Sequence, residues 1–322
     1  MTESETFWVD NGAGFELALK RVAPKGRAPI GRPAVIVPGY GMNAFIFGFH
    51  PSGRSMEEYL AAEGLEVWSV DLRGQGQSRD HARGPRAWGL AELAVDDLGV
   101  AIRGVLERTK TGARDVDLVG CSLGTSLAFA HVGCVPEAPV RCLVSMGGLV
   151  TWVKVHPLLK AAFASPWLVS KIKLRGTRTL ARALLPTIGR RAPWALSFYI
   201  HGQSTDLTHA DAMVQTVEDP VATVNRDIAE WIGRGDLVVR GVNVSARVRA
   251  MKNPLLCIVA KNDGIVPPET ARWVYESMAS EDRVLVEVGD ARTPIAHADL
   301  FVSHVAQERV FAPLARFLVD RA

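Results

Sequence analysis

Short apolar runs alternate with segments of helical periodicity along much of this chain of 322 residues. The runs are rich in Val and Leu and are bounded by Pro, Gly or Asp, as buried strands often are. They are PAVIVPG, EVWSV, DVDLVG and VRCLVSM. Between them, residues 54–63, 90–109 and 123–133 are predicted to be helices, and 90–109 repeat apolar positions at helical spacing. This alternation predicts an α/β fold with a mostly parallel central sheet and helices on both faces.

The alternating pattern is interrupted once. It stops near residue 148, and it resumes with the strand-like PLLCIVAKND, a helix at PPETARWVYESMA, the strand RVLVEV and a closing helix at AQERVFAPLARFLV. We therefore predict a core domain of residues 1–148 and 246–322, with an inserted, mainly helical cap of residues 149–245. At the N-terminal end, FWVDNGAGFELALKRV predicts a β-hairpin because Asn-Gly favours a tight turn.

Composition excludes several classes of protein. The chain is 48% hydrophobic and 22% charged with a net charge of +3, and its Lys and Arg residues look scattered, so a nucleic-acid partner is not expected. No apolar run reaches the roughly 18 residues of a membrane span, and the N-terminus does not resemble a signal peptide. The four cysteines lack the spacing of a zinc site or a disulfide framework. We expect a cytoplasmic protein with reduced thiols, and the sequence leaves its oligomeric state open.

The stretch GCSLG, residues 120–124, lies between a predicted strand and a predicted helix. A sharp strand-to-helix turn projects its central side chain above the sheet, which makes Ser122 the candidate nucleophile. Cys121 comes one position earlier, so its side chain is expected to pack around the strand as a small buried apolar group. The start of the following helix offers free N–H groups to a developing oxyanion.

A serine hydroxyl needs a base and an orienting carboxylate before it acts as a nucleophile. Among the eight histidines, His297 follows the last predicted strand and precedes the last helix, on the sheet edge where the elbow lies. Asp263 ends the predicted strand PLLCIVAKND, and the carboxyl ends of parallel strands meet at one edge. We therefore predict a Ser122, Asp263, His297 triad. His304 is expected within or just before the closing helix, and Asp290, like Asp71, is expected to organise a turn.

These motifs together resemble the α/β-hydrolase family over the whole chain apart from a diverged cap. VPGYG resembles the family's oxyanion loop, DLRGQGQS a structural loop, GCSLG the elbow, and AKNDGIVPP and AHADLF the acid and histidine loops. The resemblance implies that the N–H groups of Tyr40 and Leu123 form the oxyanion hole. Pro38 is a departure, because many members carry histidine at this position.

Residues 230–269 also resemble the corresponding region of polyhydroxyalkanoate synthases, which are acyltransferases with cysteine at the centre of the elbow. Serine at that position here favours hydrolysis, because an ester of serine is a less activated acyl donor than a thioester. We expect a serine hydrolase of carboxylic esters with a hydrophobic acyl group that needs no metal or organic cofactor. Its expected partner is a small or lipid-like ester. WVKVHPLLKAAFASPWLV, PWALSFYIHG and AFIFGF are candidate linings of the acyl pocket and its entrance.

Other functions remain open from the sequence. Acyl transfer, thioester cleavage and peptide or amide hydrolysis use the same triad, and a hydrolase-fold binding protein is a further alternative. Residues 39–44, GYGMNA, formally match a dinucleotide-binding fingerprint with Asp71 on a later strand. That match is disfavoured because the segment after it contains Gly48, Pro51 and Gly53 and does not predict a helix.

Overall fold

The computed structural model of the chain describes residues 1–81, 87–171 and 175–322. Within these ranges one large sheet has the strand order β1-β2-β4-β3-β6-β7-β10-β11, with the short β5 paired to β2. The strands are β1 (Thr2–Asp10), β2 (Phe15–Pro24), β3 (Ile30–Val37), β4 (Leu65–Asp71), β5 (Arg79–Asp80), β6 (Val116–Cys121), β7 (Val140–Met146), β10 (Leu255–Ala260) and β11 (Arg283–Val288). β2 is antiparallel to its partners β1, β4 and β5, and the pairs from β4 to β11 are parallel.

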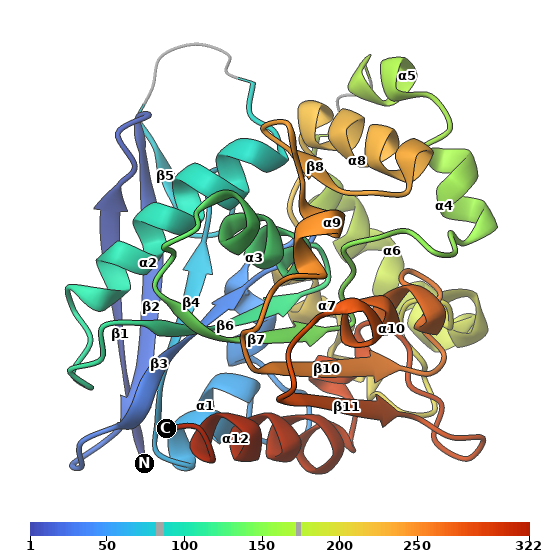
Figure 1. Cartoon of the computed structure of the whole chain (residues 1–322). Helices are drawn as coiled ribbons and strands as arrows, with labels where there is room; N and C mark the ends of the chain where they lie inside the picture. The colour runs from blue at the N-terminus through green and yellow to red at the C-terminus, as the bar shows by residue number, and fades with distance from the viewer. Residues whose placement is uncertain (82–86, 172–174) are drawn as a thin grey trace.

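Helices cover both faces of this sheet (Figure 1). The helices outside the insertion are α1 (Met56–Ala62), η2 (Glu92–Asp97), α2 (Leu98–Leu106), α3 (Leu123–Cys134), α10 (Pro268–Ser277), α11 (Asp299–Val302), η6 (Gln307–Phe311) and α12 (Ala312–Val319). α2 and α3 lie over one face, and α1 and α12 lie over the other. The predicted α/β architecture is therefore present.

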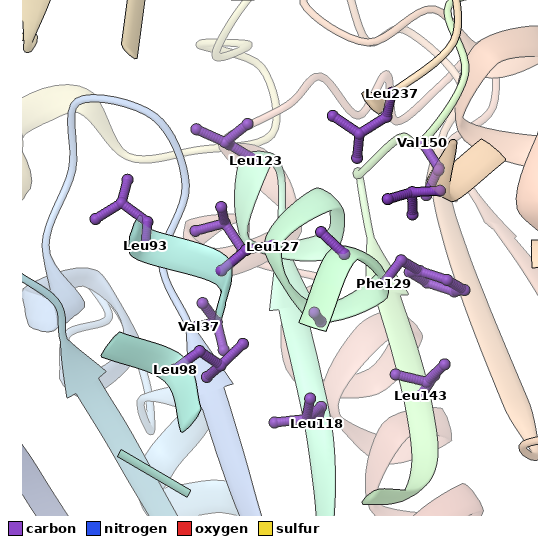
Figure 2. Packing of buried hydrophobic residues seen from close by; sticks show 14 of the residues in the cluster. Val37, Leu93, Leu98, Leu118, Leu123, Leu127, Phe129, Leu143, Val150 and Leu237 are labelled. Carbon is purple, nitrogen blue, oxygen red and sulfur yellow. The ribbon is translucent and has the colours of Figure 1, made fainter. Parts of the chain in front are cut away.

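The strands are buried on both faces, which explains their continuous apolar sequences. In β3, Val35 and Val37 belong to the core on the α2 and α3 side, while Ala34 and Ile36 belong to the core on the α1 and α12 side. Figure 2 shows Leu98, Leu127 and Phe129 of α2 and α3 close to strand residues such as Leu118 and Leu143. A strand with alternating polar residues could not serve both cores.

The chain between β7 and β10 is mainly helical, as predicted. It contains α4 (Pro157–Ala162), α5 (Pro166–Lys171), α6 (Thr177–Arg191), η3 (Pro193–Leu196), η4 (Leu207–His209), α7 (Ala210–Met213), η5 (Val214–Thr216), α8 (Ala222–Arg234), the paired β8 (Val238–Val239) and β9 (Val242–Asn243), and α9 (Val244–Val248). Leu149 and Val150 at its beginning and Val244 at its end are buried in the core beside α3. The division at residues 149 and 245 into a core domain and a cap stays a prediction.

Two local predictions from the N-terminal half can be checked in the structure. β1 and β2 pair from Thr2↔Pro24 to Asp10↔Glu16, which confirms the hairpin. Residues Ala44–Gly48, where a dinucleotide-binding protein would begin its helix, form only a short 3₁₀ turn, η1. Asp71 accepts hydrogen bonds from the N–H of Ala44 (2.8 Å) and of Gln77 (2.9 Å), so it organises the turn as expected.

The loop after β4 is held by a buried ion pair between Arg73 and Asp97. Nη2 and Nε of Arg73 donate to the two carboxylate oxygens of Asp97 at 2.6 and 2.8 Å, and the side chains are 7% and 0% exposed. The amide of Asn11 donates to the same carboxylate at 2.8 Å. One buried carboxylate therefore joins the N-terminal hairpin, the β4 loop and the start of α2.

Replacing Asp97 with Ala would leave the Arg73 guanidinium buried without its counter-charge. We expect Asp97→Ala to lower the free energy of unfolding by about 3–5 kcal/mol, measured by urea denaturation. The neighbouring Asp96 is the matched control, because it pairs with Arg240 at the surface with both side chains more than 40% exposed. Asp96→Ala should cost about 1 kcal/mol or less. Equal losses in the two variants would contradict this interpretation of the buried pair.

Candidate active site

Ser122 occupies the sharp turn between β6 and α3, with φ of 54° and ψ of −123°. A positive φ is rare for a residue with a side chain and indicates a strained turn. Its N–H donates to the carbonyl of Met146 at the end of β7, and its carbonyl accepts from the N–H of Thr125, each at 3.0 Å. The elbow predicted from GCSLG is therefore present, with Ser122 at its centre.

Both glycines of the elbow are required by close packing. A Cβ on Gly124 would collide with the carbonyl oxygen of Val37 in β3, and a Cβ on Gly120 would collide with the backbone of Thr125. The turn can close only because these positions lack side chains. Gly39 lies equally near, since a Cβ there would stand 2.8 Å from the Cβ of Ser122. The loop after β3 thus passes directly beside the candidate nucleophile.

Asp263 and His297 are hydrogen-bonded to each other. Oδ2 of Asp263 lies 2.6 Å from Nδ1 of His297, and the two side chains are 1% and 8% exposed. The other oxygen, Oδ1, accepts from the N–H groups of Ile265 and Val266, each at 2.8 Å. Because an ionised carboxylate only accepts, Nδ1 carries the hydrogen and Nε2 is left with its lone pair.

The three predicted residues come from loops at neighbouring strand ends. Ser122 follows β6, Asp263 comes three residues after the end of β10 rather than at the end of the strand, and His297 lies between β11 and α11. Ser122 and His297 line the same two cavities. Gly147, at the end of β7, lies between these loops, and a Cβ on it would be 3.6 Å from both Oδ2 of Asp263 and Cε1 of His297.

The N–H groups of Tyr40 and Leu123 flank the elbow. Leu123 is the first residue of α3, so its N–H has no acceptor within the helix. Within the described ranges, neither of these two N–H groups donates to a protein acceptor. The hydroxyl of Tyr40 donates to Oδ1 of Asn225 in α8 at 2.5 Å, and burial raises its pKa to about 12. Tyr40 therefore links the loop after β3 to the insertion.

Cys121 is a buried neighbour of the candidate nucleophile. It is 0% exposed in the core on the α1 and α12 side, and burial raises the pKa of its thiol well above the ordinary value. A thiolate is the reactive form of cysteine, so this thiol is chemically quiet. The expected packing role of Cys121 is confirmed. All four cysteines are free thiols.

The insertion is tied to the loops of Asp263 and His297 by hydrogen bonds. The N–H of Gly264 donates to the carbonyl of Phe198 at 2.9 Å, and that of Ala298 donates to the carbonyl of Tyr199 at 2.8 Å. The ring of Tyr199 lies 6.0 Å from the ring of His297. These contacts place the segment after η3 against both halves of the Asp–His pair.

Asp299, which was not predicted from the sequence, also connects the histidine loop to the insertion. It is 0% exposed, and it accepts from the N–H groups of His201 (3.0 Å) and Ala296 (2.8 Å) and from the hydroxyl of Thr205 (2.6 Å). Burial raises the pKa of its carboxyl, and these donors oppose that shift. The signal was in the sequence, since an acid two residues after the histidine in AHADLF can fold back onto its own loop.

Two apolar cavities open beside Ser122 and His297. The larger, of about 240 Å³, is lined by Tyr40, Met42, Leu123, Leu149, Trp152, Leu159, Phe163, Tyr199, Ile228, Trp231, Ile232, Ile265 and Val266. The smaller, of about 80 Å³, is lined by Met42, Ile46, Leu185, Leu196, Tyr199, Ile200, Leu207, Ala210, Met213, Thr216, Val217, Ala298, Phe301 and Val302. In the described part of the chain, no Asp, Glu, Lys or Arg lines either one. All three segments proposed from the sequence as linings contribute residues.

The rejected candidates lie elsewhere. His304 lies in the turn just before η6 and the closing helix α12, as expected, and its Nδ1 lies 2.7 Å from the carbonyl of Ser204. Asp290 accepts from the N–H groups of Arg292 and Thr293 in its own turn. Among the residues that the structure describes, no group of three or more metal-binding side chains gathers, and no helix is long and apolar enough to cross a membrane.

The elbow, the Asp–His pair and the strand order can now be set beside known proteins. A family model described as serine aminopeptidase, S33, matches residues 54–292. The chain belongs to this family of α/β hydrolases. The predicted fold, an α/β-hydrolase sheet with an inserted helical segment, is therefore confirmed. Curated relatives and structural neighbours of the chain include proteins named as esterases and lipases.

Curated relatives of this hydrolase are esterases and lipases. Lipase member N of Mus musculus is 32% identical over 150 residues, which are 43% of this chain and 36% of the relative. The matched part is thus about a third of that protein's length. Pimeloyl-[acyl-carrier protein] methyl ester esterase of Aliivibrio fischeri is 21% identical over 283 residues, covering 85% of this chain and 92% of the relative.

Solved structures share the fold across the whole chain. An esterase from Thermogutta terrifontis superposes with a TM-score of 0.65 at 18% identity, covering 98% of this chain and 99% of the other. A monoacylglycerol lipase from Paleococcus ferrophilus gives 0.62 at 18% identity, covering 95% and 100%. The similarity to polyhydroxyalkanoate synthases stays a prediction from the sequence.

The packing of the elbow can be tested at Gly124. Gly124→Ala brings a methyl group into the carbonyl of Val37, so we expect the free energy of unfolding to fall by about 3 kcal/mol or more. Guanidinium denaturation of the purified variant measures this.

Gly233 in α8 is the matched control for this substitution. It is an exposed helical glycine with nothing within 4 Å of an added Cβ, so Gly233→Ala should stabilise the protein by about 1 kcal/mol. A Gly124→Ala variant as stable as the parent protein would show that the elbow is less tightly packed than described.

Proposed function

We propose that this protein hydrolyses carboxylic esters with a hydrophobic acyl group, through an acyl-enzyme on Ser122. The observation that carries the proposal is the placement of Ser122 and the His297–Asp263 pair at two cavities with apolar linings. A nucleophile on a strained turn, an oriented imidazole and adjacent free N–H groups are the parts that acyl transfer needs.

In the first half of the reaction, Oγ of Ser122 attacks the ester carbonyl while Nε2 of His297 takes the hydroxyl proton. Asp263 holds the Nδ1–H of the ring and stabilises the imidazolium that forms. The negative charge that develops on the carbonyl oxygen is stabilised by the N–H groups of Tyr40 and Leu123. Loss of one such donor typically costs about 10²- to 10³-fold in rate.

The tetrahedral intermediate then collapses. The bond to the alcohol oxygen breaks, His297 returns its proton to that oxygen, and the acyl group stays on Ser122 as an ester. In the second half, His297 takes a proton from water, the resulting hydroxide attacks the acyl carbon, and the acid leaves as Oγ regains its proton. The chemistry of each step is supplied by this chain's own groups, with water as the second substrate.

The linings of the cavities favour esters over the aminopeptidase activity named in the family's description. An aminopeptidase must hold the charged amino terminus of a peptide, and such a group requires a carboxylate partner when it is removed from water. No acidic side chain from the described residues lines either cavity. Apolar walls suit a hydrocarbon chain. The relatives and structural neighbours named as lipases and esterases support the same choice.

The larger cavity is the better place for the acyl group. It contains Tyr40 and Leu123, whose N–H groups face the acyl carbonyl in this mechanism. The smaller cavity is lined by Ala298, Phe301 and Val302, which follow His297 in sequence. The alcohol must lie near His297 to receive its proton, so we assign the alcohol to the smaller cavity. Residues 149–245 act as the cap that closes over both.

The nucleophile is tested by initial rates on p-nitrophenyl esters from acetate to palmitate. We expect Ser122→Ala to lower kcat by roughly 10⁴-fold or more, because no other group can form the acyl-enzyme. The matched control is Cys121→Ala at the adjacent position, which should retain activity within about threefold, since its thiol is buried away from the site. Loss of activity in a folded Cys121→Ala variant, with Ser122→Ala still active, would overturn the assignment.

The acyl pocket is tested by filling the larger cavity. Leu159→Trp adds bulk where α4 lines this cavity, so we expect kcat/KM for the longest accepted ester to fall about tenfold or more, and that for p-nitrophenyl acetate to stay within about twofold. Leu158→Trp is the control, because Leu158 is 65% exposed and lies outside both linings. An unchanged chain-length profile in Leu159→Trp would place the acyl group elsewhere.

A further inference from the structure

The outer side of the insertion exposes large apolar side chains. Trp194 is 77% exposed and Trp167 is 70% exposed, although tryptophan is usually well buried. Trp167 lies on α5 and Trp194 on η3, and four exposed leucines lie on α4, α5 and α6. These six residues are Leu158, Trp167, Leu168, Leu180, Leu184 and Trp194. Elsewhere among the described residues, exposed apolar side chains such as Ile30 and Val284 are scattered, so this gathering requires an explanation.

The same segment carries a strong positive charge. Residues 149–205 contain nine Lys or Arg and no Asp or Glu, although the chain as a whole has a net charge of only +3. The segment is positive mainly because it lacks acidic residues, since its nine basic residues are only slightly more than its share of the 37 in the chain. Lys154 and Arg178 are paired with Glu269 and Glu218 across the fold. Six others point into solvent: Lys160, Lys171, Arg175, Arg182, Arg190 and Arg191.

Helices α4 and α6 have an inner and an outer side. Leu159 of α4, Phe163 directly after it and Leu185 of α6 line the two cavities, whereas Leu158 and Leu184 face solvent. Figure 1 shows α4 and α5 at the edge of the molecule that lies farthest from β1 and β2. A partner bound to this outer side would therefore lie one helix away from the walls of the candidate site.

We propose that the six exposed apolar residues and the six exposed basic residues form a surface that docks on an anionic phospholipid membrane. Tryptophan and leucine side chains insert at the boundary between head groups and acyl chains, while Lys and Arg lie among anionic head groups. This combination matches both halves of the observed surface. Docking is peripheral and places the insertion, rather than the β1 edge of the sheet, against the lipid.

Two other occupants fit less well. A second copy of the chain would bring the same unbalanced positive charges together, which opposes association. A nucleic acid would satisfy the basic residues, but exposed leucines would find no apolar partner on a phosphate backbone. A lipid surface offers negative charge and hydrocarbon in one partner.

Flotation of the full chain with vesicles tests the proposal. We expect the protein to float with phosphatidylcholine vesicles that contain phosphatidylglycerol, and about tenfold or more weakly with phosphatidylcholine alone. Added salt should reduce the difference, because it screens the attraction to anionic lipid. Ser122→Ala should float like the parent protein, because docking does not depend on the proposed ester hydrolysis.

Two variants separate the charge from the apolar contribution. The combination Lys160→Gln, Lys171→Gln, Arg190→Gln and Arg191→Gln should weaken binding to anionic vesicles about 100-fold or more. Trp167→Ser with Trp194→Ser should weaken it about tenfold or more. The six residues substituted in these two variants are all exposed, so thermal unfolding should be unchanged and shows that both variants are folded.

The control removes the same amount of charge from exposed positions outside the insertion, with Lys25→Gln, Lys252→Gln, Arg292→Gln and Arg316→Gln. This variant should bind vesicles like the parent protein. An equal loss of binding in the control would show attraction by net charge alone and would overturn the proposal. Failure of the parent protein to float with anionic vesicles, or dimerisation through the two tryptophans, would overturn it as well.

Discussion

The candidate site depends on how closely three strand ends approach one another at the elbow. β3, β6 and β7 meet there without room for a side chain at Gly120 or Gly124, and the N–H of Ser122 is bound to the end of β7. The strain of a positive φ at Ser122 persists because the neighbouring backbone over-determines the turn. The same closeness puts Gly39, the residue before Tyr40, against Ser122. The candidate nucleophile and the loop proposed to supply an oxyanion donor thus share a single packing constraint.

The Asp–His pair is placed by a different kind of interaction. Its loops leave the sheet after β10 and β11, and the buried carboxylate of Asp299 joins the histidine loop to His201 and Thr205 in the insertion. A buried carboxylate with several donors is costly to disturb, because each unmet hydrogen bond is lost in a medium of low polarity. The inserted segment therefore supports the position of His297 as well as lining the cavities. Core and insertion act together in forming the site.

Local motifs made most of the fold and the candidate residues predictable. The elbow, the hairpin and the strand RVLVEV are predicted by short-range patterns of glycine, turn residues and apolar runs, which can be seen directly in the sequence. Asp299 and the bond from Tyr40 to Asn225 were not predicted, because each joins segments about a hundred or more residues apart. The positive charge of residues 149–205 can be counted from the sequence, but it does not show in the net charge of the whole chain. Its meaning needed the exposure of Trp167 and Trp194, which only the fold supplies.

Helices α4 and α6 of the insertion carry apolar residues on both their inner and their outer sides. A helix with apolar residues on one side buries that side and shows polar residues to water. α4 and α6 depart from this rule, since leucines face the cavities and also face outward. The inner leucines reduce contact between water and the candidate triad, which strengthens its electrostatic interactions. Exposure of the outer leucines to water is unfavourable, and contact with another apolar phase removes this cost. Because exposed basic residues lie on the same segment, a partner with negative charge as well as an apolar phase fits it best. In that arrangement a single layer of helices separates the partner from the cavities.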